Sequence, residues 1–312
     1  MIGFRKVHEM KIAVLGPEGT FSDKAYLEYK KVCKQELEPV YCPTIDEVFA
    51  AGCPLGIVPI ENTLDGYVMR TLDLLLEKDV HIIDENMVEV QFALVANASS
   101  LDEIDTLYVQ FKANGQCRNF INSLHNVRIV TTESNMESYY NIADTKGSAA
   151  IVPRHIVEGV TDKLVIENVT DASYNHTRFV IFAPECIDEQ KYIKPKSFRD
   201  IPLSHEESLQ EENDCGLGSK VRIPVYIMPT VDRPGLLYAI LRIFYENKIN
   251  LISIMSRPTK QELGTYNFYI EIDGLHNRLD IILDTLDQIK VYNDIKILGI
   301  YSERRSHYER SS

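Results

Sequence analysis

The feature that most constrains the fold of this chain is an alternation of short apolar runs and helix-periodic segments between Lys11 and about Asp171. Short apolar runs predict buried strands, and apolar residues spaced three and four apart predict amphipathic helices. Strands that alternate with helices over ~160 residues are typical of α/β layers built on a largely parallel sheet or sheets. Such sheets bind ligands beyond the carboxyl ends of their strands, so the loops at those ends are candidate sites.

The alternation predicts individual elements along the first part of the chain. Strands are expected over residues 11–15, 40–42, 55–59, 87–96, 107–109, 127–130, 149–152 and 164–166. Helices are expected after a cap at Ser22, after a cap at Thr44 with Glu47 three residues later, and over residues 67–78, 115–124 and 136–143.

A second pattern covers residues 220–302. Strands are expected over 221–228, 250–255, 266–272 and 295–301, and helices over 236–247 and 278–290. This β-α-β-β-α-β order is that of a ferredoxin-like α+β domain. Between the two patterns, residues 185–219 lose the periodicity and are rich in acidic side chains, which predicts a solvated linker. The expected domains are therefore 10–184, a linker over 185–219, and 220–302.

Length and charge exclude several classes of function. A chain of 312 residues is too long for one ordinary core. The net charge of -13 argues against nucleic-acid binding and means that an anionic ligand must be held by local donors. The six cysteines form no C-x-x-C pair and have no histidine at metal spacing, which predicts reduced thiols in a cytoplasmic protein without a metal site. Neither a signal sequence nor an apolar run of the ~18 residues that a membrane helix needs is evident.

Two loops carry residues suited to an anion at a helix N-terminus. The first is Gly16-Pro17-Glu18-Gly19-Thr20-Phe21-Ser22, and the second is Pro59-Ile60-Glu61-Asn62-Thr63-Leu64-Asp65-Gly66. Glycine allows a close backbone approach, and short hydroxyl and amide side chains orient carboxylates without adding charge. The first loop lacks both the G-x-G-x-x-G spacing and the lysine of a phosphate loop, which disfavours a nucleotide. A plain strand-to-helix turn and a capped loop remain the alternatives.

A third segment, Thr177-Arg178-Phe179, follows Asn175-His176 and opens an apolar run that predicts a buried strand. Thr177 can place its hydroxyl in a cleft, and Arg178 then points to the opposite face of the strand. There Arg178 is better suited to an ion pair than to direct ligand contact. In their order along the chain, the three segments predict one pocket for a small substrate that bears carboxylates.

These residues resemble the motifs of the prephenate dehydratases. Gly16 to Ser22 resembles the family's GPEGTFS. Gly56 to Thr63 and Thr71 to Leu75 resemble its GVVPIENS…TLDLL, and Asp171 with Asn175 to Phe179 resembles its D…N-x-TRF. In the C-terminal pattern, Arg233-Pro234-Gly235-Leu236-Leu237 and Ser256-Arg257-Pro258 look like the two signature segments of an ACT domain.

The resemblance implies a fold and a reaction. It implies a catalytic region of two α/β lobes, similar to type II periplasmic binding proteins, with the substrate in the cleft. The reaction is the decarboxylating dehydration of prephenate to phenylpyruvate in phenylalanine biosynthesis, and aromatisation drives it without a metal or an organic cofactor. Thr177 is then expected to donate a hydrogen bond to the leaving hydroxyl. The residues expected to hold the substrate are Thr20, Ser22, Asn62, Thr63 and Arg178.

The ACT-like segments imply regulation and assembly. Phenylalanine is the expected effector, bound at an interface between paired ACT domains, so the chain is expected to form a homodimer or a homotetramer. The effector-binding residues are expected to be Pro234, Gly235, Leu236, Leu237, Ser256, Arg257 and Pro258.

The chain also departs from the family pattern. Gln110-Phe111 replaces the usual His-Pro before the retained Gln116-Cys117, Tyr67 replaces a serine, and Met255 replaces the glutamate before Ser-Arg-Pro. These changes leave two alternatives open. One is a relative that dehydrates arogenate or decarboxylates prephenate without forming an aromatic ring, and the other is a non-catalytic protein that binds an amino acid.

Overall fold

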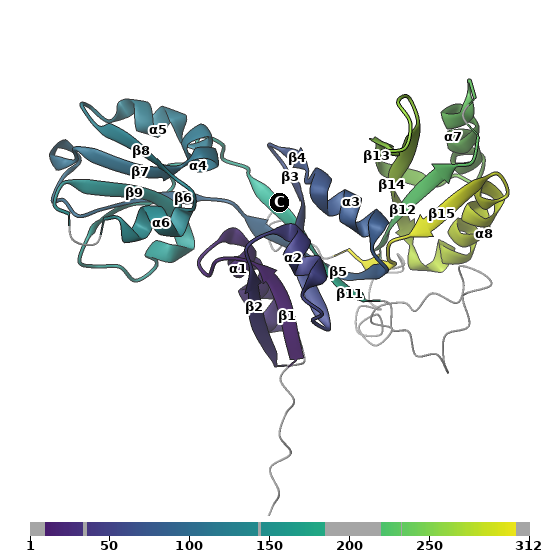
Figure 1. The fold of residues 1–312 in the computed structure, drawn as a ribbon, viewed down its shortest axis with the longest axis horizontal. Coiled ribbons are helices and arrows are strands. Elements are labelled where there is room, and N and C mark those ends of the chain that lie inside the picture. Colours follow the sequence, from purple (N-terminus) through teal and green to yellow (C-terminus); the bar gives the residue numbers. More distant parts are fainter. Residues whose placement is uncertain (1–9, 34–35, 143–144, 185–219, 232, 304–312) are drawn as a thin grey trace, which may run out of the picture. The chain divides into compact units, whose positions relative to one another are not determined.

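The structure is a computed structural model that describes residues 10–33, 36–142, 145–184, 220–231 and 233–303 (Figure 1). These residues fall into two compact units. The first lies within Met1–Thr71 and Asn86–Phe179, and the second within Leu72–Glu85 and Val180–Ser312. The expected acidic linker over residues 185–219 lies outside the described residues.

The first sheet carries the glycine loop and the Thr177 segment. Its strands are β1 (Met10–Leu15), β2 (Leu37–Cys42), β3 (Leu55–Asn62), β4 (Gly66–Tyr67), β5 (Val80–Glu89) and β11 (His176–Pro184). The strand order is β2-β1-β3-β11-β5, with β4 paired to β3. The helices that follow these strands are α1 (Phe21–Val32), α2 (Ile45–Ala50) and α3 (Met69–Glu77). Parallel pairing of β1 with β2 and β3 confirms the α/β pattern here.

The second sheet has the order β10-β6-β9-β7-β8. Its strands are β6 (Phe92–Ala96), β7 (Thr106–Gln110), β8 (Arg128–Thr132), β9 (Ser148–Pro153) and β10 (Leu164–Ile166). Strand β7 runs parallel to β8 and β9, but β6 runs antiparallel to β9 and β10. The expectation of a largely parallel sheet is therefore wrong for this part. Apolar spacing predicts that a strand exists but does not give its direction.

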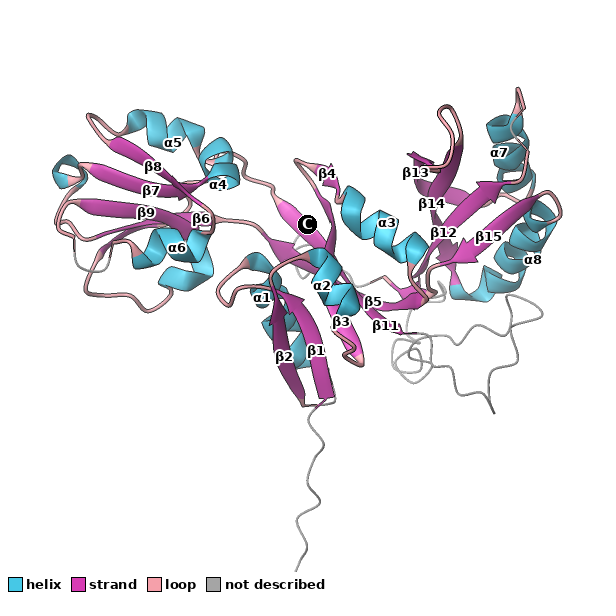
Figure 2. Cartoon of the chain, in the orientation of Figure 1, coloured by secondary structure: helices cyan, strands magenta, loops and turns pink. Residues whose placement is uncertain are grey.

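Helices cover both faces of the second sheet (Figures 1 and 2). They are α4 (Phe111–Gln116), α5 (Arg118–Ser123) and α6 (Asn135–Tyr140). Successive residues of β6 divide between two cores: Leu94 packs with Ala113 of α4, whereas Val95 packs in the core that Tyr139 of α6 joins. The alternation of side chains along a strand thus decides which helix each residue meets.

The third sheet confirms the predicted β-α-β-β-α-β order. Its elements are β12 (Lys220–Pro229), α7 (Leu236–Glu246), β13 (Asn250–Pro258), β14 (Tyr266–Leu275), α8 (Leu279–Lys290), β15 (Asn293–Ile297) and β16 (Tyr301–Ser302). The order is β13-β14-β12-β15, with antiparallel pairing between neighbours and β16 paired to β12. Residues of both helices, including Phe244 and Leu286, close one apolar core against this sheet.

Residues 72–85 belong to the same compact unit as this third sheet. The Tyr226 hydroxyl, which is fully buried, donates to the carbonyl of Leu72 at 3.1 Å. The Lys296 ammonium donates to the carbonyl of Leu76 at 3.1 Å, at the end of α3. Ile82 and Gly299 form a parallel bridge, and a Cβ atom on Gly299 would lie 2.2 Å from the Ile82 carbonyl oxygen. Only glycine permits this approach.

Buried charges also join residues 72–85 to the third sheet. We call Arg222, Glu85, Glu271 and Glu303 the Arg222 cluster. Arg222 lies 3.5 Å from Glu85, 3.1 Å from Glu271 and 2.7 Å from Glu303. Tyr269 donates its hydroxyl to the other oxygen of Glu271, whose side chain is fully buried. Removing the arginine would therefore leave at least one carboxylate buried without its main compensating charge.

Four local expectations are wrong. Thr20, not Ser22, caps α1, because its Oγ1 accepts a hydrogen bond from the Asp23 N–H at 3.3 Å. Helix α3 begins at Met69 because the preceding residues turn back and pair with β3. The strand expected over 87–96 is two strands that are separated by residues 90 and 91. In addition, the helix expected over 115–124 is two short helices, α4 and α5.

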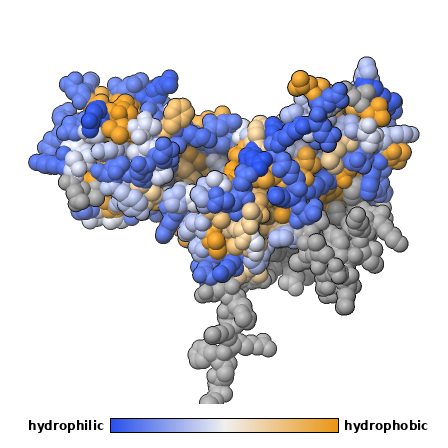
Figure 3. Space-filling view, in the orientation of Figure 1, coloured by the Kyte–Doolittle hydropathy of each residue, from blue (hydrophilic) through white to orange (hydrophobic). Residues whose placement is uncertain are grey.

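The surface is mixed in character. The face drawn in Figure 3 is largely hydrophilic, with apolar residues gathered in separate patches. Among the residues that the structure describes, no helix combines the length and the apolar character needed to cross a membrane.

Candidate active site

The glycine loop binds a carboxylate of its own. Asp23, which is 3% exposed, accepts a hydrogen bond from the Gly19 N–H at 2.8 Å, and the Tyr41 hydroxyl donates to its other oxygen. The Asp23 N–H is in turn used by the Thr20 cap. The start of α1 therefore already holds a negative charge next to the helix N-terminus. Sequence reasoning missed this because an acidic residue in a first helical turn usually faces solvent.

Gly19 fits this loop for two reasons. Its φ is +84°, a left-handed value that other residues rarely adopt. A Cβ atom there would lie 2.5 Å from the sulfur of Met136 and 3.0 Å from Ile156. The loop after β1 therefore touches residues that follow the second sheet's strands, and a side chain at this position would separate them.

The second loop is a hairpin turn and not the start of a helix. Asn62 ends β3, and its Oδ1 accepts hydrogen bonds from the N–H groups of Leu64 at 2.9 Å and Asp65 at 3.0 Å. Gly66, with a φ of +74°, then turns the chain into β4. The expected row of donors at a helix mouth is therefore wrong here, because the Asn62 side chain stabilises the turn by an Asx-type contact.

Asn62 also contacts the Thr177 segment. Its Nδ2 lies 2.9 Å from Asn175 Oδ1, 3.1 Å from the His176 carbonyl and 2.9 Å from Thr177 Oγ1. The structure thus brings together two of the residues that the sequence singled out. Thr63 joins them, because its N–H donates to the His176 carbonyl and its Oγ1 accepts from the His176 N–H, both at 3.0 Å.

Arg178 lies next to Thr177 but contacts a different group. Its guanidinium is 3% exposed and donates to Glu61 Oε2 at 3.2 and 2.9 Å. The predicted ion pair is therefore present. Glu61 and Asn62 are consecutive residues of β3, as Arg178 and Thr177 are of β11, so two neighbouring contacts tie the ends of these strands together.

Two titratable groups, His176 next to Thr177 and Cys117 next to Gln116, are unsuited to proton transfer near pH 7. Burial lowers the pKa of His176, and Lys24 adds to this against the opposing charge of Glu89. His176 is therefore neutral in the pH range where an acid would be needed. Burial raises the pKa of the Cys117 thiol to about 12, which keeps this thiol protonated and unreactive.

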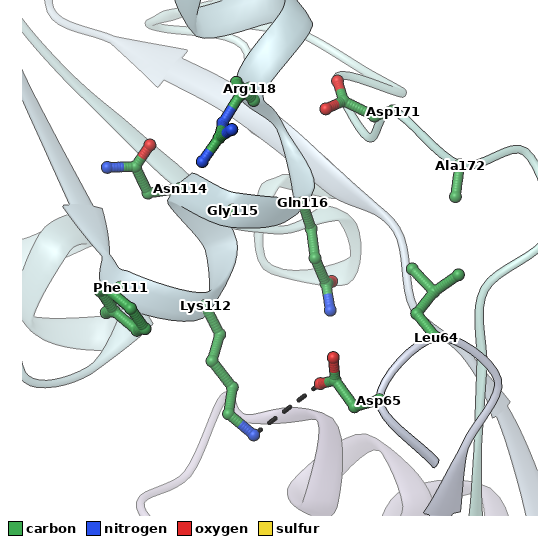
Figure 4. A pocket seen from close by; sticks show the side chains of 10 residues that line it. All are labelled: Leu64, Asp65, Phe111, Lys112, Asn114, Gly115, Gln116, Arg118, Asp171 and Ala172. Atoms are coloured by element: carbon green, nitrogen blue, oxygen red, sulfur yellow. Dashed lines mark ion pairs between the residues drawn. The ribbon is translucent and has the colours of Figure 1, made fainter.

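A cavity of about 580 Å³ lies beside this network (Figure 4). Its lining residues are Leu64, Asp65, Phe111, Lys112, Asn114, Gly115, Gln116, Arg118, Asp171 and Ala172. The six residues expected to contact the substrate are not among them. The link is Asn175, because its Nδ2 donates to Gln116 Oε1 at 3.1 Å while its Oδ1 accepts from Asn62.

The cavity includes residues that sequence reasoning missed. Lys112 lies 3.9 Å from Asp65 across the cavity, and Arg118 supplies a second cation (Figure 4). Gln110, which stands in place of the family's histidine, caps α4 by accepting from the Lys112 N–H at 2.7 Å. In the sequence, only Gln116, the retained glutamine of the Gln-Cys pair, indicated that this segment could line a site. The other amide and cationic residues of the lining follow no periodic pattern in the sequence, so the sequence did not predict them.

Thr20 and Ser22 lie apart from these contacts. Thr20 Oγ1 serves as the cap of α1 and lies 3.4 Å from the Leu15 carbonyl, and Ser22 is buried within the helix. Within the part of the chain that the structure describes, neither side chain forms a hydrogen bond with the Thr177 segment.

The two segments expected to bind an effector lie in the third sheet's unit. Gly235 precedes α7 with a φ of +83°, and Leu236 and Leu237 pack against the apolar core. Ser256, Arg257 and Pro258 end β13. Arg257 donates to Asp73 at 2.6 Å, and Lys260 lies 2.9 Å from the other oxygen of Asp73. Asp73 belongs to the Thr71 to Leu75 segment that resembles the family's TLDLL.

Known proteins resemble this chain over nearly its whole length. The prephenate dehydratase family model matches residues 12–186, and the ACT domain model matches residues 230–289. The prephenate dehydratase of Methanocaldococcus jannaschii is 32% identical over 290 residues, which are 91% of this chain and 95% of that protein. Among solved structures, the prephenate dehydratase of Staphylococcus aureus is 25% identical, with a TM-score of 0.71 and coverage of 94% of this chain and 100% of that one.

A second solved structure contains an amino acid. The prephenate dehydratase of Arthrobacter aurescens in complex with L-Phe is 26% identical, with a TM-score of 0.73, and the match covers 94% of this chain and 90% of that one. Family models thus cover both the region that holds Thr177 and the third sheet, and the relatives align over nearly their whole length. The chain belongs to the prephenate dehydratase family and carries a C-terminal ACT domain.

Proposed function

We propose that this chain is a lyase that converts prephenate to phenylpyruvate and that phenylalanine regulates it through the ACT domain. Prephenate carries two carboxylates and a ring hydroxyl. The bond from the ring to one carboxylate breaks and releases carbon dioxide, and its electron pair completes the aromatic ring. The hydroxyl leaves with one proton as water. The enzyme must therefore hold the carboxylates and stabilise the departing hydroxyl oxygen.

The observation that carries this proposal is the hydrogen bond between Asn62 and Thr177. An amide nitrogen can only donate, so Thr177 Oγ1 accepts at this contact. The Thr177 proton is then available for another oxygen, and no described residue accepts it. Thr177 is 9% exposed, and in such a poorly solvated place a positioned donor acts more strongly than in water. Thr177 accordingly donates a hydrogen bond to the leaving hydroxyl.

Substrate binding is distributed over several groups. Thr63 is exposed and its hydroxyl accepts only from a backbone N–H, which leaves its proton for the substrate. Thr20 and Ser22 remain proposed ligands because they lie at the start of α1. Asn62 acts through Thr177. Arg178 acts through Glu61, with its guanidinium held away from direct substrate contact. Lys112 and Arg118 of the cavity are two cations that can face the substrate carboxylates, beside the carboxylates of Asp65 and Asp171 in the same lining.

For regulation, phenylalanine is proposed to bind at Pro234 to Leu237 and Ser256 to Pro258 of paired ACT domains. The ACT match and the relative in complex with L-Phe support this proposal. The chain accordingly forms a homodimer or a homotetramer, a state that light scattering of the purified chain measures directly. Calorimetry with phenylalanine should show binding, together with inhibition of turnover.

The experiment that tests the activity is incubation of the purified chain with prephenate and identification of the product by mass spectrometry. Phenylpyruvate is expected. A non-aromatic decarboxylated product, turnover of arogenate alone, or binding without turnover would each replace the proposal with one of its alternatives. Thr177→Ala should lower kcat about 100- to 1,000-fold. Thr177→Ser, which keeps a hydroxyl in the same place, should retain more activity. Near-unchanged turnover in a folded Thr177→Ala variant would refute the role of Thr177.

A further inference from the structure

Asn175 occupies the centre of a chain of hydrogen bonds that runs from Thr177 to the cavity. We call Thr177, Asn62, Asn175 and Gln116 the amide network. Asn175 is fully buried and precedes β11, whereas Asn62 ends β3 and Gln116 ends α4. The contacts are Thr177 to Asn62 at 2.9 Å, Asn62 to Asn175 at 2.9 Å, and Asn175 to Gln116 at 3.1 Å.

The direction of every bond in the amide network follows from its first member. The Oδ1 atom of Asn62 accepts from the backbone N–H groups of Leu64 and Asp65, which can only donate. A reversed Asn62 amide would place its NH₂ group against two donors, so its orientation is settled. Asn62 Nδ2 must then be the donor toward Thr177 Oγ1 and Asn175 Oδ1, both at 2.9 Å, and the His176 carbonyl at 3.1 Å shares its two hydrogens. Asn175 is left to donate its own NH₂ group to Gln116 Oε1.

Gln116 ends the amide network at the cavity. Its side chain extends from α4 into the cavity in Figure 4, and its Oε1 is occupied by Asn175. The remaining group, Nε2, carries two hydrogens, and no residue that the structure describes accepts a hydrogen bond from it. Both ends of the amide network therefore expose donors: the Thr177 hydroxyl at one end and the Gln116 amide at the other. A substrate with carboxylate and hydroxyl oxygens is complementary to such a surface.

We propose that Asn175 is a positioning residue that fixes the polarity of the amide network, so that Gln116 presents a hydrogen-bond donor to the substrate. The proposal rests on the proposed function for the identity of the substrate. Asn175 touches no substrate atom and acts through Gln116. If its polarity were reversed, Gln116 would turn its carbonyl oxygen toward a substrate carboxylate, and attraction would become repulsion.

The variant that reverses the polarity is Asn175→Asp. A carboxylate of nearly the same shape still accepts from Asn62 but cannot donate to Gln116. Gln116 must then donate Nε2 to residue 175 and turn Oε1 into the cavity. We expect KM for prephenate to rise about tenfold or more, the effect of one lost hydrogen bond to a charged group. We expect kcat to change less than threefold, because Asn62 still donates to Thr177.

A double-mutant cycle separates this route from a general effect of the new charge. Gln116→Met removes the cavity donor and should itself raise KM. If Asn175 acts through Gln116, Asn175→Asp should add little in the Gln116→Met background. If both single effects multiply in the double variant, or if Asn175→Asp leaves KM unchanged, the proposal is overturned. Urea unfolding of each variant checks that the comparison is made between folded proteins.

A second variant keeps the test decisive if Asn175→Asp fails to fold. Gln116→Glu leaves the acceptor for Asn175 in place but puts a carboxylate oxygen, instead of an amide, toward the cavity. KM should again rise tenfold or more, and an unchanged KM would contradict the proposal. Failure of the proposed function is distinguishable: if the wild-type chain binds prephenate but does not turn it over, the same variants are compared by calorimetric Kd, where the same pattern is expected.

Discussion

The amide network around Thr177 and the Arg222 cluster organise their surroundings by opposite means. The amide network is formed by neutral groups, and each hydrogen bond in it has a direction that the backbone of Leu64 and Asp65 imposes. The Arg222 cluster is formed by charges, with one guanidinium facing three carboxylates. Reversing one amide exchanges a hydrogen-bond donor for an acceptor while the shape of the side chain stays nearly the same. Removing the guanidinium, in contrast, takes away the positive charge that compensates the carboxylates. The proposed role of Thr177 thus depends on the direction of its hydrogen bond, and stability at Arg222 depends on charge compensation.

The largest expected effect is on the Arg222 cluster and is a loss of stability. Arg222→Met should lower the free energy of unfolding by about 3–5 kcal/mol, because the buried Glu271 carboxylate loses the positive charge of the guanidinium that it faces. Urea unfolding followed by circular dichroism measures this change. Arg242→Met is the matched control, since Arg242 pairs with Glu246 on the surface of α7, and it should cost less than about 1 kcal/mol. Equal effects of the two changes would show that burial of the Arg222 cluster has no energetic consequence.

The second-largest expected effect is on the amide network and is a change in kcat. Asn62→Asp keeps the acceptor for Leu64 and Asp65 but removes the donor to Thr177, whose hydroxyl must then donate to the new carboxylate. We expect kcat to fall about 100-fold or more. Steady-state kinetics with prephenate measures the change. Asn122→Asp, on the exposed side of α5, makes the same chemical change elsewhere and should leave kcat unaltered. If Asn62→Asp changes only KM or the free energy of unfolding and leaves kcat intact, the direction of the hydrogen bond between residue 62 and Thr177 is unimportant for turnover.

The smallest effect concerns Asp73. Burial alone would raise the pKa of this carboxyl, but the hydrogen bonds and charges of Lys260 and Arg257 outweigh it and hold the pKa below its usual value. A depressed folded-state pKa gives stability that is present above the unfolded pKa of about 3.9 and is lost as pH falls through the folded value. Asp73→Asn should therefore cost about 1.5 kcal/mol at pH 7, and the difference from wild type should shrink below about pH 4.

The Asp73 comparison has its own control in the effector response. Arg257 lies within the segment proposed to bind phenylalanine, so releasing it from Asp73 should change the phenylalanine concentration needed for half-inhibition. A pH-independent difference in unfolding, with an unchanged phenylalanine response, would contradict a role for the Asp73 pair in either property.

Much of the fold was predictable because it follows from local patterns. The Thr44 and Glu47 cap is present as expected, with Thr44 accepting from the Glu47 N–H at 3.2 Å. The face of α1 with Ala25, Tyr26 and Tyr29 is buried, as its spacing predicts. The wrong predictions concern features that depend on tertiary contacts. The apolar run over 87–96 gives no sign of the break between β5 and β6. The helical spacing of α3 extends back to Tyr67, which instead pairs with β3.

Only part of the candidate site's contact network was predictable from the sequence. Thr177 and Asn62 stand in motifs, and the structure joins them. Asn175 and Gln116 are far apart in the sequence, and no periodic pattern of amide residues predicts that their side chains form a hydrogen bond. Asp23 is the clearest failure, because a first-turn carboxylate usually serves the helix from the surface and here it is buried beneath the glycine loop.

The association of residues 72–85 with the third sheet has a consequence for the order in which the chain folds during synthesis. Domains generally fold as units, starting from the N-terminus, as they leave the ribosome. This unit cannot do so, because its first segment is made long before Tyr226 and Lys296, which hold the carbonyls of Leu72 and Leu76. Until these later strands are made, the carbonyls of Leu72 and Leu76 lack the two donors that they have in the finished unit. We therefore expect a ribosome-bound chain that stops before residue 220 to be a better chaperone substrate than the finished protein.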